Sequence, residues 1–225
     1  MREIVLDTET TGLDPAVGHR IVEVACLELF NHLPTGRNYQ SYINPERDMP
    51  MSAFEVHGLS DAFLADKPRF AEVADALLAF IGDAPLVIHN ARFDIGFLNA
   101  ELDRLGRTPI DGGRAVDTVL LARQKFPGAQ VSLDALCRRF EIDNSARTKH
   151  GALLDAELLA EVYLELIGGR QPTLGLAAGA AESLQVRIAA QRPVRPARPF
   201  APSDEELAAH EAFIAKLKDP IWRLG

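Results

Sequence analysis

The sequence contains little cysteine and tryptophan, and it has no apolar run long enough to span a bilayer. Its two cysteines, Cys26 and Cys137, stand among apolar neighbours, so we expect them to be core thiols in a reducing compartment. The chain opens directly into a predicted strand rather than a signal-like segment. These absences argue against a disulfide-stapled secreted domain and a membrane-spanning protein, and they predict a cytoplasmic one.

Positive charge is scarce as well, and it is unevenly distributed. Residues 1–167 carry 16 Lys and Arg against 26 Asp and Glu, a net charge of −10, whereas residues 168–225 carry a net charge of +2. A domain this acidic binds phosphate groups poorly unless it holds metal ions or is tethered to its target. The composition changes at residue 168, so we expect a globular domain over 1–167, a flexible linker over 168–202 and a helical tail over 203–225.

Two acidic residues, Asp7 and Glu9, are closely spaced in the segment IVLDTETTG. The apolar run before them predicts a strand that begins at residue 3 or 4, and alternation along a strand places Asp7 and Glu9 on one face and Thr8 on the other. Neighbouring carboxylates repel each other unless a hard, oxygen-binding cation such as Mg²⁺ or Mn²⁺ lies between them. The alternative is a solvated strand end that leads into the turn TTGLDP.

A further acidic residue, Asp94, follows a predicted buried strand over 86–89 and lies in the first turn of a predicted amphipathic helix. The positive end of the helix dipole also favours an acid at this position. Its position alone therefore does not distinguish a metal ligand from a residue that stabilises the helix.

The segment HGALLDAELLAEVYLEL predicts another amphipathic helix, which carries Asp155. His150 and Asp155 are separated by about 140° around a helix axis, so they cannot share a helical face. We therefore expect His150 in the loop before the helix, folded over the site, and Asp155 in the first turns. The alternative for His150 is a solvated or capping residue.

Together, D-x-E-T-T-G, H-N-x-x-F-D and H-x-A-L-x-D resemble the DEDD exonuclease superfamily, in the subgroup whose fifth residue is a histidine spaced H-x-x-x-x-D. The resemblance covers residues 4–166. It implies an α/β ribonuclease H-like fold, with a mixed sheet flanked by helices, and release of nucleoside 5′-monophosphates from a 3′ end. It further implies two divalent cations, Mg²⁺ or Mn²⁺, and a general base. The implied metal ligands are Asp7, Glu9, Asp94 and Asp155, with Asp7 touching both cations, and the implied base is His150.

A second histidine, His89, is the rival for the role of base. It lies at a predicted strand end, where a structural hydrogen bond is also expected, and the spacing of the subgroup falls on His150 instead. We therefore favour His150. Asn90, which follows His89, is a candidate contact to the substrate.

Other candidate substrate contacts lie in two short segments. Backbone N–H groups of Thr10, Thr11 and Gly12 could hold the terminal nucleotide, since glycine permits a close approach of the backbone. Phe93 and His57 could stack on terminal bases, a contact worth about 1 to 3 kcal/mol per base. The alternatives are core packing for Phe93 and an ordinary turn position for His57.

Residues 171–176, with the sequence QPTLGL, resemble the short glutamine-led peptide that docks on the bacterial sliding clamp. Gln171 would be the leading residue, and Leu174 and Leu176 would be the apolar anchors. Short motifs of this kind also match by chance.

The tail carries a predicted capping box, Ser203 to Glu206, which opens a helix with apolar residues along one face. The single tryptophan, Trp222, lies beyond this helix with little of its own domain to pack against. Tryptophan is enriched among binding hot spots, so we favour contact with a partner, the polymerase subunit that the resemblance implies. The alternative is that the helix folds back on the catalytic domain.

The function that the resemblance implies, together with the tail, is removal of mismatched 3′-terminal nucleotides during DNA replication, as a subunit of a polymerase assembly that supplies the tether. A stand-alone exonuclease that trims RNA could use the same acidic residues and histidine. A non-catalytic adaptor between polymerase and clamp is the alternative from another class of protein.

Overall fold

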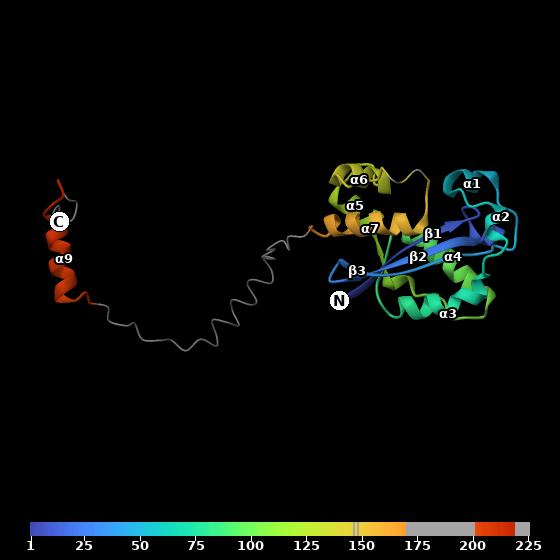
Figure 1. The fold of residues 1–225 in the computed structure, drawn as a ribbon, viewed down its shortest axis with the longest axis horizontal. Coiled ribbons are helices and arrows are strands. Elements are labelled where there is room, and N and C mark those ends of the chain that lie inside the picture. Colours follow the sequence, from blue (N-terminus) through green and yellow to red (C-terminus); the bar gives the residue numbers. More distant parts are fainter. Residues whose placement is uncertain (146, 148, 170–200, 219–225) are drawn as a thin grey trace. The chain divides into compact units, whose positions relative to one another are not determined.

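The computed structural model describes residues 1–145, 147, 149–169 and 201–218 (Figure 1). The chain divides into two compact units, Met1–Thr173 and Leu174–Gly225, and each is described by itself. The predictions made for Gln171, Leu174, Leu176 and Trp222, and for most of the linker, fall outside the described residues. Within the described ranges, no helix has the length and apolar character needed to cross a membrane.

A five-stranded mixed sheet, in the order β3-β2-β1-β4-β5, forms the centre of the first unit. Strand β1 (Arg2–Thr10) pairs antiparallel with β2 (Ile21–Phe30), which pairs antiparallel with β3 (Leu33–Tyr42). On its other side, β1 runs parallel to β4 (Leu86–Ile88), and β4 runs parallel to β5 (Ala115–Asp117). The predicted mixed sheet is confirmed.

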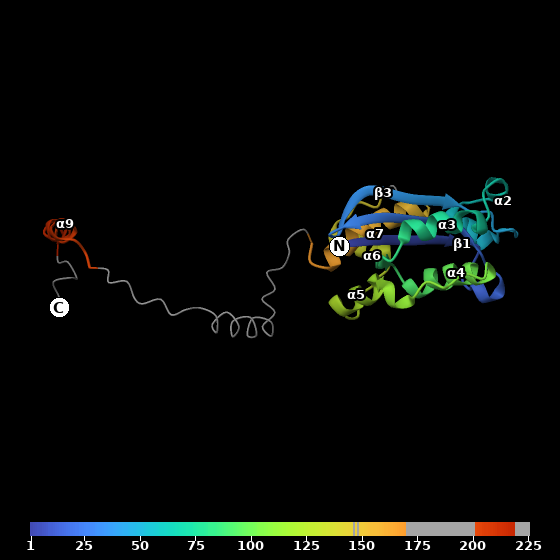
Figure 2. The same cartoon turned by 90° about the horizontal axis from the view of Figure 1, so that it is seen from below.

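Helices cover both faces of this sheet (Figures 1 and 2). On one face, α3 (Phe70–Ile81) and α4 (Ala91–Arg104) pack on the sheet through a core that contains Ile4 and Leu6 of β1. These two side chains are fully buried. The apolar residues that predicted the helix after residue 90 supply most of the α4 contribution to this core.

The opposite face is covered by α5 (Thr118–Lys125), α6 (Leu133–Phe140) and α7 (Ala152–Leu166), through a core that contains Val5 of β1. Cys137 lies in this core and Cys26 in the other, and both are buried free thiols as predicted. Short elements complete the unit: η1 (Pro15–Val17), α1 (Met51–His57), α2 (Asp61–Leu64) and η2 (Gly112–Arg114).

Alternation along β1 continues past the apolar core to the end of the strand. Asp7 and Glu9 share the face of Val5, toward α7, whereas Thr8 lies on the α4 face. The hydroxyl of Thr8 donates a hydrogen bond to Asp94 of α4, which confirms that it faces away from the two acids. The end of β1 therefore presents side chains to both helical layers.

In the second unit, α9 (Asp204–Ile214) begins with the predicted capping box. The amide of Glu206 donates to Ser203 Oγ at 3.3 Å, and the amide of Ser203 donates to Glu206 Oε2 at 2.8 Å. Within residues 201–218 of this unit, the large apolar side chains of Leu207, Phe213 and Leu217 are exposed.

Candidate active site

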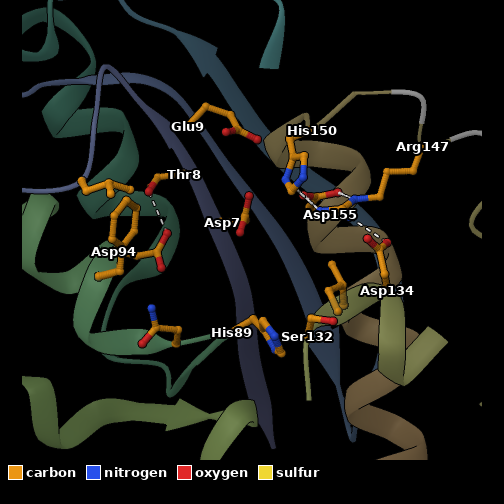
Figure 3. Close-up of a pocket in the computed structure, with 14 residues that line it drawn as sticks. Asp7, Thr8, Glu9, His89, Asp94, Ser132, Asp134, Arg147, His150 and Asp155 are labelled. Atoms are coloured by element: carbon orange, nitrogen blue, oxygen red, sulfur yellow. Dashed lines mark hydrogen bonds and ion pairs between the residues drawn. The ribbon is translucent and has the colours of Figure 1, made fainter. Parts of the chain in front are cut away.

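The predicted metal ligands meet in one cavity of about 460 Å³ at the carboxyl end of β1. In Figure 3, Asp7 lies between Asp94 on one side and Asp155 with His150 on the other. Strand β1 is central in the sheet, and both helical layers reach its end. Segments that are far apart in the sequence meet here for that reason. The cavity is lined by Asp7, Thr8, Glu9, Leu13, His89, Asn90, Phe93, Asp94, Ser132, Leu133, Asp134, Arg147, His150 and Asp155.

Asp94 lies in the first turn of α4 and is only 3% exposed. Burial raises the pKa of Asp94 to about 7, although the hydrogen bond from Thr8 acts in the opposite direction. The hydroxyl of Thr8 lies 2.7 Å from Asp94 Oδ1 and fixes that oxygen. Thr8 is thus a site residue that sequence reasoning missed, because alternation marked it only as facing away from the acids.

Asp7 and Glu9 concentrate negative charge at the end of the strand. Burial, followed by the nearby charges of Asp94, Glu9 and Asp155, raises the pKa of Asp7 well above its usual range. Burial, with Asp155 and Glu23 adding to it, raises the pKa of Glu9 to about 8. Side chains that resist carrying negative charge together are suited to a site that divalent cations neutralise.

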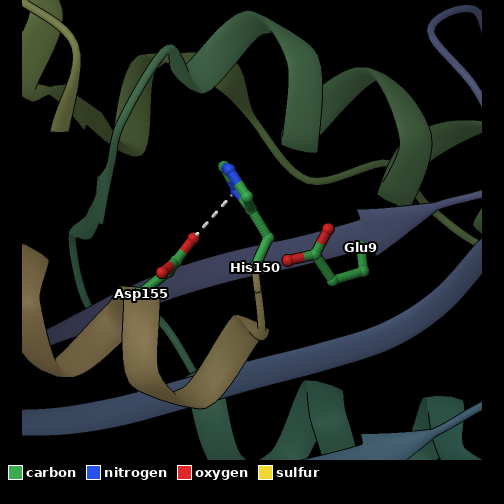
Figure 4. A group of neighbouring side chains, drawn as sticks. All are labelled: Glu9, His150 and Asp155. Atoms are coloured by element: carbon green, nitrogen blue, oxygen red, sulfur yellow. Dashed lines mark ion pairs between the residues drawn. The ribbon is translucent and has the colours of Figure 1, made fainter. Parts of the chain in front are cut away.

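His150 lies in the loop before α7, and Asp155 lies in the first turn of that helix, as the helical-wheel argument predicted. The amide of His150 donates to the Val56 carbonyl at 3.2 Å, which holds this loop to α1. The ring Nδ1 lies 3.3 Å from Asp155 Oδ2. One ligand atom from each of Glu9, His150 and Asp155 lies within 4.8 Å of the others, a group able to hold a metal ion (Figure 4).

Arg147 enters the site from the same loop, and sequence reasoning missed it. Its Nε and Nη2 donate to the two carboxylate oxygens of Asp155, its Nη1 donates to Asp134 at 2.8 Å, and its Nη2 lies 2.8 Å from His150 Nδ1. Burial would raise the pKa of Asp155, but hydrogen bonds from Arg147 and His150 outweigh it and hold that pKa below its usual range. The available signal was an arginine close before His150 in a strongly acidic domain.

The rival histidine, His89, lines the cavity, and its ring makes a hydrogen bond with Thr118. Its Nδ1 lies 2.9 Å from Thr118 Oγ1, and Thr118 donates in turn to the Ile88 carbonyl. Burial lowers the pKa of His89. These contacts support the structural role that its position at a strand end suggested.

Asn90 and Phe93 both line the cavity. Asn90 has a left-handed backbone conformation, with φ of 71°, and its backbone N–H donates to Asp117 Oδ1 at 3.3 Å. Phe93 is half-buried and packs on Phe97, with ring centroids 4.9 Å apart. At Phe93, exposure to the site and core packing therefore occur together.

Thr10 and Thr11, the last two threonines of the DTETTG segment, lie outside the cavity lining. The amide of Thr11 donates to the Arg20 carbonyl at 2.9 Å, and its hydroxyl accepts from the Arg20 amide at 3.0 Å. The amide of Thr11 is therefore not available to a nucleotide, contrary to the expectation, because the following loop pairs with it. Thr10 directs its hydroxyl to the Gly12 carbonyl at 2.6 Å.

Gly12 and His57 also differ from their expected surroundings. A Cβ atom at Gly12 would lie 2.4 Å from the His19 ring, so the group that approaches this glycine closely is His19. His57 ends α1, is 6% exposed, and accepts the Leu59 amide on Nδ1 at 3.0 Å. It is absent from the cavity lining, which agrees with the turn position considered as its alternative.

Comparison with known proteins adds to this geometry. The exonuclease family model matches residues 4–163. The chain is 50% identical over 222 residues to the DNA polymerase III subunit epsilon of Rickettsia conorii, covering 96% of both proteins. It is 48% identical over 236 residues to the DNA polymerase III subunit epsilon of Escherichia coli K12, covering 99% of this chain and 97% of that protein.

Among solved structures, the nuclease domain of 3′hExo, a DEDDh family member bound to rAMP, matches with a TM-score of 0.65 and 18% identity. The match covers 74% of this chain and 91% of that one. The predicted ribonuclease H-like exonuclease fold is confirmed by this likeness and by the mixed sheet.

Proposed function

Because this chain belongs to the exonuclease family and, within it, to the epsilon subunits of DNA polymerase III, we propose that it removes mismatched nucleotides from 3′ ends during DNA replication. Dependence on divalent metal is general for the family, and the chain has the residues for it. The observation that carries the proposal is the convergence of the predicted acids and His150 on one cavity.

The donor set fits hard divalent cations, since it consists of clustered carboxylates, several of which have raised pKa values. Asp7, Glu9, Asp94 and Asp155 would hold two of them, Mg²⁺ or Mn²⁺. When bound, such a pair offsets the charge that develops on the attacking and leaving oxygens of a phosphodiester.

His150 would accept the proton of the attacking water. Arg147 is a donor only, so where its Nη2 faces Nδ1 the neutral ring must carry its proton on Nε2. A ring that accepts a proton on Nε2 must instead carry one on Nδ1, where Asp155 Oδ2 can receive it in a hydrogen bond. Proton transfer to Nε2 of His150 therefore requires Arg147 to leave Nδ1.

The product of the proposed reaction is a nucleoside 5′-monophosphate.

The partners belong to the same proposal. The polymerase (alpha) subunit would bind the tail over 203–225 through Trp222, and the sliding clamp would bind residues 171–176. The exposed apolar side chains of the second unit, Leu207 among them, support a protein partner there. Attachment of this kind would compensate for the weak attraction of an acidic domain to DNA. We place the protein in the cytoplasm, with its replication partners.

The test is hydrolysis by the purified full-length chain with Mg²⁺, on a DNA duplex with a 3′ mismatch, the matched duplex and an RNA of the same sequence. We expect mononucleotide release from DNA, fastest from the mismatched end, and none from an Asp7→Ala variant. Preference for RNA would favour the RNA-trimming alternative. Absence of hydrolysis, with binding to polymerase intact, would favour the adaptor.

A further inference from the structure

Glu23 is a buried acid that lies beside the catalytic cavity without lining it. It belongs to β2 and stands directly opposite Glu9 in the antiparallel pairing with β1. Directly opposed residues of two strands point to the same face of the sheet, and like charges in such a pair repel each other. Burial first, then the charges of Asp155 and Glu23, raise the pKa of Glu9 to about 8. A second acid at this position is therefore costly, and its contacts show what offsets the cost.

Both oxygens of the Glu23 carboxylate accept hydrogen bonds from neutral donors. Oε2 accepts the backbone N–H of Ala152 at 3.2 Å, and Oε1 accepts Gln40 Nε2 at 2.7 Å. Gln40 comes from β3, on the side of β2 that faces away from β1. With both oxygens bonded, the carboxylate has a fixed orientation between the sheet and α7.

Ala152 is the first residue of α7, so its N–H has no acceptor inside the helix. Gly151, at the N-cap position, has no side chain that could accept it. Ala152 is fully buried, which keeps water from this N–H, and a buried backbone donor needs a partner. Glu23 therefore caps α7 from a neighbouring strand, in a place where the helix dipole also favours an acid.

This cap lies between the two residues that α7 and the preceding loop bring to the site. His150 comes two residues before Ala152, and Asp155 comes three residues after it (Figure 4). A shift of the helix start would move both side chains relative to Asp7 and Glu9. Because β2 pairs with the whole of β1, Glu23 fixes the start of α7 in the same frame as these two acids.

Another buried carboxylate anchors α7 far from the cavity. Glu3 of β1 is on the same face as Glu9 but near the opposite end of the strand, and it accepts a hydrogen bond from the Tyr163 hydroxyl at 2.7 Å. It is absent from the cavity lining. Glu3 thus holds the same helix to the same sheet without being near the metal ligands, which makes it a matched control for Glu23.

We propose that Glu23 is a positioning residue, which holds the N-terminus of α7 so that Asp155 and His150 face the acids of β1. The reach of its carboxylate to Ala152, rather than its charge, carries this role. The inference rests on the proposed function, since it concerns the same metal-binding carboxylates and the same base.

Two substitutions separate reach from charge. Glu23→Gln keeps the length of the side chain and an oxygen acceptor for Ala152, and Gln40 can turn its own amide to match the new one. Glu23→Asp keeps the charge, but it is one methylene shorter and does not reach Ala152.

We expect Glu23→Asp to lower kcat on single-stranded DNA with Mg²⁺ by about tenfold, the lower end of the effects seen for residues that orient metal ligands. KM for the DNA should stay close to the wild type, because Glu23 does not line the cavity. Affinity for Mn²⁺, measured by titration calorimetry without DNA, should also fall by about tenfold. Glu23→Gln should restore both quantities to near the wild-type values.

The control variant, Glu3→Asp, shortens the carboxylate at the far end of α7. It should lower the melting temperature as Glu23→Asp does, but leave kcat and Mn²⁺ affinity unchanged. Hydrogen exchange of the Ala152 N–H, followed by NMR, should become faster in Glu23→Asp and not in Glu3→Asp. This combination distinguishes a local effect on the site from a general loss of stability.

Wild-type kcat and Mn²⁺ affinity in Glu23→Asp would overturn the positioning role, and so would an equal loss in Glu23→Gln or in Glu3→Asp. A Glu23→Asp protein that does not fold would show that the cap serves the fold as a whole, and would overturn it too. Inactivity of the wild-type chain on DNA would instead overturn the proposed function, while Mn²⁺ binding, which needs no hydrolysis, would still test the cap.

Discussion

The guanidinium of Arg147 holds both carboxylate oxygens of Asp155, with Nε 2.5 Å from Oδ1 and Nη2 2.6 Å from Oδ2. The two side chains are only 7% and 5% exposed, so water screens this pair little. A divalent cation at Asp155 would face the positive charge of the guanidinium and compete with it for the lone pairs of the same two oxygens. Arg147 thus stabilises the metal-free protein and competes with the metal that Asp155 is proposed to bind.

Replacing Arg147 by methionine should separate these two effects. In metal-free buffer the free energy of unfolding should fall by about 3 kcal/mol, because Asp155 is left buried without its partner. Affinity for Mg²⁺ or Mn²⁺ should rise, since the competitor is gone. Chemical denaturation with a chelator and titration calorimetry measure the two quantities. Arg138→Met, at an exposed position on α6, is the matched control. Weaker metal binding by the Arg147 variant would show that Arg147 supports the metal site.

Thr8 offers a test of how Asp94 is oriented. Thr8→Val keeps the branched shape and removes the hydroxyl that donates to Asp94, so metal affinity or kcat should fall by about 10 to 100-fold. Thr8→Ser keeps the donor and should stay close to the wild type. Equal activity of the valine and serine variants would remove Thr8 from the site.

Stability of the metal-free protein should depend on pH through Glu9 and Asp94. The pKa values of Glu9 and Asp94 are about 8 and about 7 in the folded state, above those of the same groups in an unfolded chain. At any pH between the unfolded and the folded pKa of each group, the folded state therefore binds more protons than the unfolded state. The free energy of unfolding must then decrease as pH rises, from about pH 5 to about pH 8. Denaturation at a series of pH values, with a chelator, measures this trend. Added Mg²⁺ or the Glu9→Gln substitution should flatten it, and a rise in stability across the window would contradict the assignment.

Catalysis and attachment should separate along the chain. A protein of residues 1–167 should hydrolyse short single-stranded DNA at close to the full-length rate, because all candidate metal ligands and His150 precede the cut, but it should not bind the polymerase. Trp222→Ala should weaken that binding by about 2 kcal/mol or more and leave nuclease activity on free DNA unchanged. Changing Gln171 and Leu174 together should weaken clamp binding alone. Co-elution of the truncated protein with the polymerase would place the partner surface on the catalytic domain.

The parts of the site that the sequence predicted are those fixed by local periodicity. Alternation along β1 placed Thr8 opposite Asp7 and Glu9, and the helical repeat placed His150 ahead of α7. Both follow from backbone geometry within one element. The acids themselves were found because their spacing resembles that of a known superfamily.

What the sequence did not predict depends on contacts between elements. Arg147 lies in a loop without periodicity, and its partners Asp134 and Asp155 come from two different helices. The glycine of DTETTG suggested close approach of a nucleotide, but the approaching group is His19, which only the folding of the next loop brings there. Interactions of this kind are set by tertiary packing rather than by local propensity.

Because Asp94 belongs to one helical layer and Asp155 to the other, their separation is set by the thickness of the layers packed on β1. The side chains that separate β1 from these layers are apolar: Ile4 and Leu6 on the α4 side, and Val5 on the α7 side. A larger or smaller side chain at these positions would move the carboxylates apart or together without altering any ligand. Mg²⁺ requires shorter and more regular oxygen distances than Ca²⁺ does. Discrimination between cations of different radius would therefore be governed in part by the hydrophobic core, remote from the metal itself.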